Sequence, residues 1–197
     1  MEVIRASEYR TTAWKNGGGS TTEIAVSPVA ASLDDFDWRV SMARVTSDGL
    51  FSEFSGIDRT LAILRGNGLT LTISDAAPVV LDENSEPIHF PGDTPTSARL
   101  IAGEIIDLNI MTRRGRFEHR LRRIVEPTCC DFDNHESALA IAYGAKVELS
   151  LPGGKTVLAD GDTTILTRAD DASFTITPAG SAGCYLVLLR PWRYHAG

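Results

Sequence analysis

The stretch FSEFSGIDRTLAILRGNGLTLTI, residues 51–73, decides the fold class. Apolar residues alternate with polar ones on both sides of Gly66-Asn67-Gly68, and a period of two is typical of β-strands. Glycine and asparagine readily adopt the positive φ that short turns need, so the sequence predicts two strands joined as a β-hairpin. Asp58 and Arg59 lie where the chain enters this hairpin, and a fixed arginine beside a cavity is one way to hold an anionic ligand.

The rest of the chain continues in the same manner. Short apolar or alternating segments are separated by glycine, proline and aspartate, and helical periodicity is nearly absent, with room for one short turn of helix around residues 131–137. Many short strands with this punctuation predict an all-β sandwich or barrel. The strands are expected at residues 3–5, 22–26, 36–46, 78–81, 88–91, 98–102 and 105–111.

Two of these strands have one apolar and one polar face. In residues 36–46 the polar face carries Arg39 and Ser41, and in residues 105–111 it carries Asn109. Such strands suit a sheet in which one face packs against a core while the other lines something polar or wet.

An internal repeat indicates two domains. Residues 61–71 resemble residues 139–149, and two further similarities recur at nearly the same offset, which predicts a duplication. The chain is therefore expected to form an N-terminal barrel over residues 1–116 and a C-terminal barrel over residues 117–197. The segment equivalent to the 105–111 strand is apolar on both faces, so the C-terminal barrel is expected to be filled and structural.

Composition excludes several classes of function. The chain of 197 residues has a formal net charge of −7, which disfavours nucleic acid as a partner because phosphate binding needs clustered lysine and arginine. Three cysteines without metal-type spacing fit a reduced, cytoplasmic protein. No apolar run reaches the length of a membrane span, and the N-terminus has no leader-like apolar region, so a soluble protein without membrane contact is expected.

Four separated motifs occur in the first two thirds of the chain, in the order W-x-N-x-x-G-x-T-x-E-I at 14–24, W-R-x-S-x-A at 38–43, G-x-F-S-x-F-x-G-x-x-R at 49–59 and D-L-N-I-M-T-R at 107–113. In these motifs the chain resembles the HutD/Ves family. The resemblance implies a bicupin, that is, two tandem jelly-roll-like β-barrels in one chain, from a bacterial cytoplasm. It also implies an association with histidine utilisation and the binding of a small pathway metabolite, without an established enzymatic activity.

Metal and covalent chemistry are not expected. Cupins usually hold a metal with two closely spaced histidines, a glutamate and a later histidine, whereas the corresponding segment here has no histidine and the four histidines stand singly. A metal site made from His89, Asp93 and Glu104 is a disfavoured alternative. A dyad of Cys129 or Cys130 with His135 would require the loop between them to fold back. We therefore expect no metal, no cofactor and no catalytic nucleophile.

The positions that match the family motifs form the candidate ligand site. If their strand faces turn into the barrel, arginine and asparagine become donors suited to a carboxylate, and a tryptophan can close the mouth. The alternative is that Arg39–Glu23 or Arg59–Asp58 are structural ion pairs under the glycine-rich loop. The candidate ligand-binding residues are Trp14, Asn16, Thr21, Glu23, Arg39, Ser41, Ser52, Arg59 and Asn109.

The sequence thus predicts a metal-free cupin, a monomer or homodimer, that binds a small anionic metabolite. Formate, formylglutamate or a urocanate-like acid are the ligands that the family association suggests, with a role as a governor of histidine utilisation. A second hypothesis is a metal-independent isomerase or hydrolase acting on a small acid, with Glu23 or Asp107 as the base. A third is a protein-binding governor whose pocket is vestigial.

Overall fold

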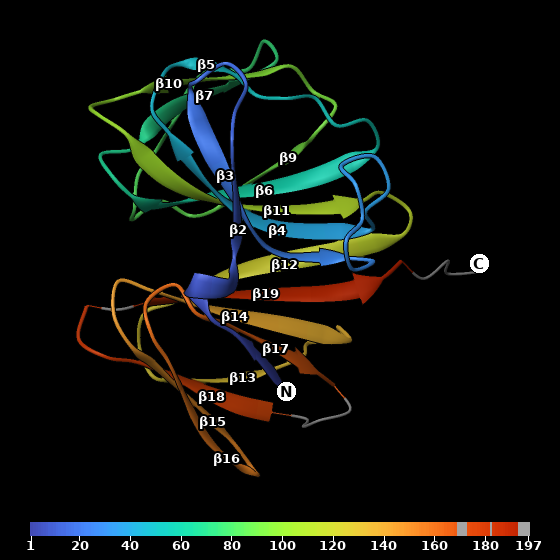
Figure 1. Cartoon of the computed structure of the whole chain (residues 1–197), viewed down its shortest axis with the longest axis vertical. Coiled ribbons are helices and arrows are strands. Elements are labelled where there is room, and N and C mark those ends of the chain that lie inside the picture. Colours follow the sequence, from blue (N-terminus) through green and yellow to red (C-terminus); the bar gives the residue numbers. More distant parts are fainter. Residues whose placement is uncertain (169–172, 182, 193–197) are drawn as a thin grey trace. The chain divides into compact units, whose positions relative to one another are not determined.

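β-Strands make up nearly all of the regular structure in the computed structural model, which describes residues 1–168, 173–181 and 183–192 (Figure 1). The exception among the described residues is one 3₁₀ turn, Ala6–Glu8, so the all-β prediction is confirmed. The loop near residues 131–137 contains a turn and no helix. None of the described helical segments is long and apolar enough to cross a membrane. The chain divides into two compact units, residues 10–116 and residues 1–9 together with 117–197.

The N-terminal unit, residues 10–116, contains ten strands in two antiparallel sheets. Its strands are β2 (Arg10–Ala13), β3 (Gly19–Ser27), β4 (Trp38–Val45), β5 (Gly49–Leu50), β6 (Ile57–Arg65), β7 (Leu69–Ile73), β8 (Val79–Leu81), β9 (Ile88–Pro91), β10 (Thr96–Leu100) and β11 (Ile105–Arg113). One sheet has the order β2-β3-β4-β11-β6-β9 and the other β5-β10-β7-β8.

The C-terminal unit, residues 1–9 and 117–197, is also built from two sheets. Its strands are β1 (Glu2–Ile4), β12 (Phe117–Ile124), β13 (Thr128–Asp131), β14 (Ser137–Tyr143), β15 (Val147–Leu151), β16 (Gly154–Leu158), β17 (Thr163–Thr167), β18 (Ser173–Pro178) and β19 (Gly183–Pro191). The sheet orders are β1-β17-β14-β19-β12 and β13-β18-β15-β16. The first strand of the chain thus pairs with β17 in this unit.

The two units repeat one topology. Within the N-terminal unit the orders β9-β6-β11-β4 and β5-β10-β7-β8 become, on adding eight to each label, β17-β14-β19-β12 and β13-β18-β15-β16 of the C-terminal unit. The remaining strands, β2 and β3 in one unit and β1 in the other, extend the larger sheet at opposite edges. This repeated strand order agrees with the duplication predicted from the sequence.

The turn at residues 66–68 connects two sheets, so the predicted hairpin is wrong. β6 pairs with β9 and β11, whereas β7 pairs with β8 and β10. Gly68 has φ +88°, and a Cβ added there would lie 2.1 Å from the carbonyl oxygen of Leu81. The turn therefore needs glycine to pass close to the end of β8, and period-2 patterning alone does not reveal which strands pair.

The two units differ in the chemistry of their interiors. In the N-terminal unit, Leu61 and Ile63 of β6 pack against Leu69 and Leu71 of β7 in an apolar cluster at one end of the barrel. The interior of the C-terminal unit is apolar along β19, where Cys184, Leu186 and Leu188 join alanines of β14 and apolar residues of the facing sheet. The equivalent strand of the N-terminal unit, β11, instead carries the buried polar residues Asp107 and Asn109.

Candidate functional site

The candidate site lies on the inner face of the larger N-terminal sheet. Residues directly opposite each other on paired strands share a face. Strands β4, β11 and β6 lie side by side in this sheet (Figure 1). One row across them runs from Arg39 on β4 through Met111 on β11 to Arg59 on β6, and the next contains Ser41 and Asn109. This is the face that carries the apolar cluster around Leu61 and Ile63, so the polar faces predicted for β4 and β11 turn inward. Two strand spacings separate the Cα atoms of Arg39 and Arg59 by about 10 Å.

Arg59 is a buried cation that contacts no carboxylate among the described residues. Its side chain donates from Nε (3.2 Å) and Nη2 (2.7 Å) to Oδ1 of Asn109, and from Nη1 (3.3 Å) to the carbonyl oxygen of Ser52. These bonds leave a hydrogen on each of Nη1 and Nη2 without a partner among the described residues. The residue is 6% exposed, so the charge is held almost entirely out of water.

Three aromatic rings surround the same guanidinium. The Cζ atom of Arg59 lies 5.0 Å from the ring centre of Phe51, 5.7 Å from that of Phe54 and 5.2 Å from that of Phe90. Phe51 and Phe54 belong to the segment between β5 and β6, and Phe90 is paired with Arg59 across β6 and β9. The negative faces of aromatic rings stabilise a cation while presenting no anionic atom, so the three rings do not neutralise the arginine.

Asn109 connects Arg59 to a buried acid. The Nδ2 group of Asn109 donates to Oδ1 of Asp107 at 3.0 Å, and Asp107 is 1% exposed. Burial raises the pKa of Asp107 to about 7, although the hydrogen bond from Asn109, the charge of Arg59 and a backbone hydrogen bond from Ala43 each oppose the shift. Asp107 therefore exchanges its proton near neutral pH, unlike an ordinary aspartate.

Arg39 is paired, in contrast to Arg59. Its Nε donates to Oε2 of Glu23 on β3 at 2.8 Å, and the side chains are 12% and 34% exposed. The ion-pair alternative predicted for Arg39 and Glu23 therefore holds as a contact. The Arg59–Asp58 pair does not form, because successive residues of a strand point to opposite faces, and Asp58 accepts from Arg114 instead.

Electrostatics couples the two inward-facing arginines. Burial lowers the pKa of Arg59 to about 10, attraction to Asp107 opposes the shift, and repulsion from Arg39 adds to it. Arg39 and Arg59 thus place two cations on one inner face, and Glu23 pairs with only the first of them. Such a region favours the binding of an anion.

The glycine-rich segment before β3 packs against the N-terminal sheet. A Cβ on Gly19 would lie 2.2 Å from the carbonyl oxygen of Arg44 and 2.9 Å from the ring of Trp14, so the close approach is to other protein segments. The indole of Trp14 donates to Oγ1 of Thr21 at 2.8 Å. The exposed side chain of Asn16 accepts from the backbone N–H of Gly18 at 3.1 Å and so closes its own turn.

The structure thus assembles the predicted set unevenly. The inner face is shared by Thr21, Glu23, Arg39, Ser41, Arg59 and Asn109. Ser52 contributes its backbone carbonyl, and its side chain makes no described contact with Arg59. Trp14 is bonded to Thr21, and Asn16 closes the glycine-rich turn between them. None of these three side chains has a described hydrogen bond to Arg39 or Arg59.

The residues of the disfavoured metal and dyad hypotheses do not converge. Among the described residues, no three histidine, cysteine, aspartate or glutamate side chains gather where they could hold a metal ion. His89 bonds to Thr60 at 3.0 Å, whereas Asp93 and Glu104 each pair with an arginine. Nδ1 of His135 lies within hydrogen-bonding distance of two backbone carbonyl oxygens, and Cys129 is exposed while Cys130 is buried.

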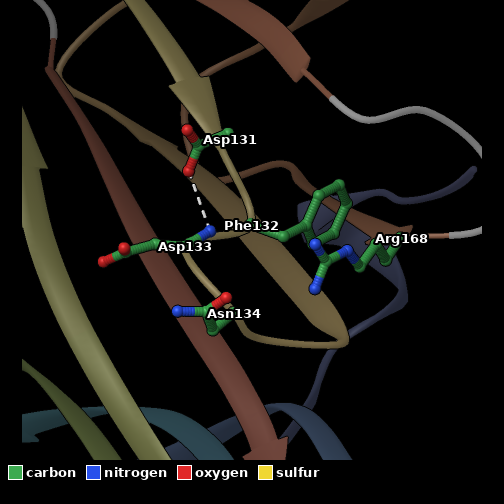
Figure 2. A pocket seen from close by; sticks show the side chains of 5 residues that line it. All are labelled: Asp131, Phe132, Asp133, Asn134 and Arg168. Carbon is green, nitrogen blue, oxygen red and sulfur yellow. Dashed lines mark hydrogen bonds between the residues drawn. The ribbon is translucent and has the colours of Figure 1, made fainter.

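A pocket of about 340 Å³ lies in the C-terminal unit, and none of the predicted site residues lines it. The loop after β13 contributes Asp131, Phe132, Asp133 and Asn134 to its lining, and Arg168 lies beside the ring of Phe132 (Figure 2). The backbone N–H of Asp133 donates to Oδ1 of Asp131 at 2.8 Å, and its carboxylate pairs with Arg120 at 2.6 Å. The local acids are therefore engaged in holding the loop.

Sequence reasoning left two parts of the inner-face site out of the ligand set. The sequence predicts Asp107 only as a possible base. Its position two residues before Asn109 on the same face of the strand nevertheless places it next to Asn109. The aromatic rings around Arg59 are absent from the predicted ligand set, because the pairing of β6 with β9 that brings Phe90 beside Arg59 is not evident from the sequence.

Two barrels of repeated topology in one chain define a bicupin. A cupin barrel-domain protein from Leptotrichia buccalis has the same fold, with TM-score 0.56, 10% identity and coverage of 96% of this chain and 98% of that one. The HutD family model matches residues 6–184, and the chain belongs to the HutD family. The resemblance predicted from the four motifs is thereby confirmed.

Relatives and a solved structure agree with this assignment. An uncharacterised 21.2 kDa protein of the hutC 3′ region of Pseudomonas putida is 32% identical over 153 residues, 78% of this chain and 79% of its own. Protein Ves of Citrobacter koseri is 34% identical over 146 residues, 74% of each chain. HutD of Pseudomonas fluorescens SBW25, solved in a formate condition, has TM-score 0.82 and 29% identity and covers 98% of this chain and 99% of that chain.

Proposed function

We propose that the N-terminal unit binds a small carboxylate on its inner face, between Arg39 and Arg59. The observation that carries this proposal is the state of Arg59, a buried guanidinium whose direct partners are an amide oxygen, a backbone carbonyl and three aromatic rings. A buried charge is costly unless it is paired, and a carboxylate ligand supplies the missing pair. The hydrogens left on Nη1 and Nη2 match the two oxygens of one carboxylate.

The neighbourhood of Arg59 supports an anion for a second reason. Arg39 repels Arg59 across the inner face, and an anion bound near both attracts each of them and so offsets this repulsion. The Arg39–Glu23 pair fixes the direction of Arg39 while using one N–H of its guanidinium. Both arginines are therefore pre-positioned, which reduces the conformational entropy lost on binding.

The ligand class follows from the family and from the size of the anchor. One guanidinium edge enclosed by rings suits a compact acid, and HutD of Pseudomonas fluorescens SBW25 was solved in a formate condition. Formate is the simplest member of the class, and formylglutamate and urocanate-like acids carry the same carboxylate. A protein that senses such an acid would act as a governor of histidine utilisation in the cytoplasm.

Calorimetry with formate and the two larger acids tests the proposal. Arg39→Lys and Arg59→Lys replace a planar fork by a point charge, and each is expected to weaken binding by about 1–3 kcal/mol, the scale of a lost charged hydrogen bond. Arg44→Lys on β4 and Arg65→Lys on β6 are matched controls, since both residues are exposed and belong to the same strands. Equal binding by all four variants would place the ligand elsewhere.

One observation favours a second candidate, a metal-independent enzyme acting on a small acid. A carboxyl group with a pKa of about 7 is suited to proton transfer at neutral pH, and Asp107 has this property. Turnover of the same acids by the wild-type protein, abolished in Asp107→Asn, would support an enzyme. Binding without any chemical change in the acid supports the ligand-binding function.

A further inference from the structure

Asp107, Asn109 and Arg59 form a continuous hydrogen-bonded chain inside the N-terminal unit. The amide oxygen of Asn109 accepts from Arg59 at 2.7 Å, and its amide nitrogen donates to Asp107 at 3.0 Å. Both ends of the amide are engaged, so its orientation is fixed by a cation on one side and an acid on the other. Any change of charge at Arg59 is therefore transmitted to Asp107 through one side chain.

Few other charges face Asp107. The residues beside it in its row are Ala43 of β4 and Ile63 of β6, and the facing sheet contributes apolar residues such as Leu71. The other charged groups on this inner face are Arg59, at the far end of the Asn109 bridge, and Arg39 with its partner Glu23. Arg10 of the edge strand β2 pairs in register with Glu23 and is exposed to solvent. The Arg39–Glu23 pair is internally neutral and Arg10 is solvated, so the charge balance at the ligand position depends mainly on Arg59 and Asp107.

Building on the proposed carboxylate site, we propose that it takes one carboxylate group together with one proton, and that Asp107 holds this proton as a positioning residue. With Asp107 ionised, Arg59 is already balanced, and an added carboxylate would leave a net negative charge in a buried region. With Asp107 protonated, the carboxylate and Arg59 form a neutral pair. Protonated Asp107 still has an oxygen to accept from Asn109, so the orientation of the amide is preserved.

The cost of the protonation is small under ordinary conditions. Burial raises the pKa of Asp107 to about 7, so the group is already partly protonated at neutral pH. A carboxylate bound at Arg59 neutralises the positive charge that opposes this shift, so the pKa of Asp107 rises further in the complex.

Formate titrations of the full chain by calorimetry between about pH 5.5 and pH 8.5 test this inference, since formate itself stays ionised in this range. The expected result is an affinity that falls with rising pH above about 7, by up to about tenfold per pH unit. At about pH 8, where Asp107 is mostly ionised before binding, repetition in buffers of different ionisation enthalpy is expected to give uptake of up to about one proton per formate bound.

Two variants assign the proton. Asp107→Asn is expected to give a pH-independent affinity and no proton uptake, while Glu23→Gln, which alters the other carboxylate of the inner face, is expected to retain the pH dependence. An infrared difference spectrum of the wild-type protein with and without formate provides a test that needs no variant. At about pH 8 a new protonated-carboxyl band on binding is expected, and its absence would overturn the inference.

The outcomes separate this inference from the proposed function. Formate that binds with a pH-independent affinity and no proton uptake would overturn the role of Asp107 and leave the carboxylate site intact. No binding of formate at any pH would overturn both. Proton uptake that persists in Asp107→Asn would assign the proton to another group and contradict the inference.

Discussion

Replacing Arg59 by methionine separates a ligand-binding role from a structural one. Burial lowers the pKa of Arg59 to about 10, attraction to Asp107 opposes the shift, and repulsion from Arg39 adds to it. The difference from the ordinary arginine value corresponds to about 3 kcal/mol by which the folded protein disfavours the guanidinium charge. Removing a buried charge in favour of an apolar side chain of similar length is often neutral or stabilising.

The opposing costs of Arg59→Met are smaller. Methionine keeps an unbranched stem among the three phenylalanine rings, and thioethers pack well against aromatic groups. The amide oxygen of Asn109 loses its donor, which costs about 1–3 kcal/mol. At about pH 6 Asp107 is protonated and does not become an unpaired charge. We therefore expect the free energy of unfolding to be unchanged or higher by up to about 2 kcal/mol, with formate binding lost.

Urea denaturation without ligand at about pH 6, followed by tryptophan fluorescence, measures the first quantity, and calorimetry with formate measures the second. Arg65→Met is the control, because Arg65 is an exposed residue of the same strand, and it is expected to change stability by about 0.5 kcal/mol or less and to keep formate binding. A loss of about 3 kcal/mol or more in Arg59→Met would refute the reasoning. It would show that the guanidinium stabilises the fold of the N-terminal unit and is not primarily a ligand-binding group.

Three further predictions concern proton linkage, thiols and a turn. The raised pKa of Asp107 means that the folded chain keeps a proton which the unfolded chain releases above about pH 4, so stability falls as the pH rises from about 4 to about 7. In Asp107→Asn this decline is expected to lessen by up to about 1 kcal/mol per pH unit, as measured by urea denaturation across that window. A thiol reagent is expected to modify Cys129 alone in the native protein and all three cysteines in denaturant, because Cys130 and Cys184 are buried and their pKa values are raised. Mass spectrometry counts the adducts, and modification of a second thiol in the native state would contradict this prediction. Gly68→Ala is expected to destabilise the protein by about 2 kcal/mol or more, because residue 68 has a positive φ and lies against the Leu81 carbonyl. Gly103→Ala, at positive φ in open space, is expected to cost about 1 kcal/mol. Thermal denaturation measures both, and equal costs would show that the close approach is unimportant.

The fold was predictable from the sequence because its signals are local. Period-2 patterning and glycine punctuation identify the strands, and the offset between residues 61–71 and 139–149 reveals the duplication. Which strands pair was not predictable in the same way. Gly66-Asn67-Gly68 has the composition of a hairpin turn, yet the chain uses it to pass from one sheet to the other, and only the long-range pairings of β6 and β7 make this plain.

The site was predictable to the extent that it depends on strand faces. Alternation in β4 and β11 places Arg39, Ser41 and Asn109 on one side, and the register aligns them with Arg59. The distinction between the two arginines was not accessible, because it depends on partners from other strands. Arg39 meets Glu23 across a β-bulge in β3, whereas Arg59 meets aromatic rings from a loop and from β9.

A crystal structure of this chain grown with formate at about pH 6 tests the central claim most directly. The account predicts one formate on the inner face of the N-terminal unit, with its two oxygens within hydrogen-bonding distance of Nη1 and Nη2 of Arg59 and with Arg39 on its other side. Formate bound only elsewhere, such as in the pocket beside Arg168, with no density at Arg59, would contradict it.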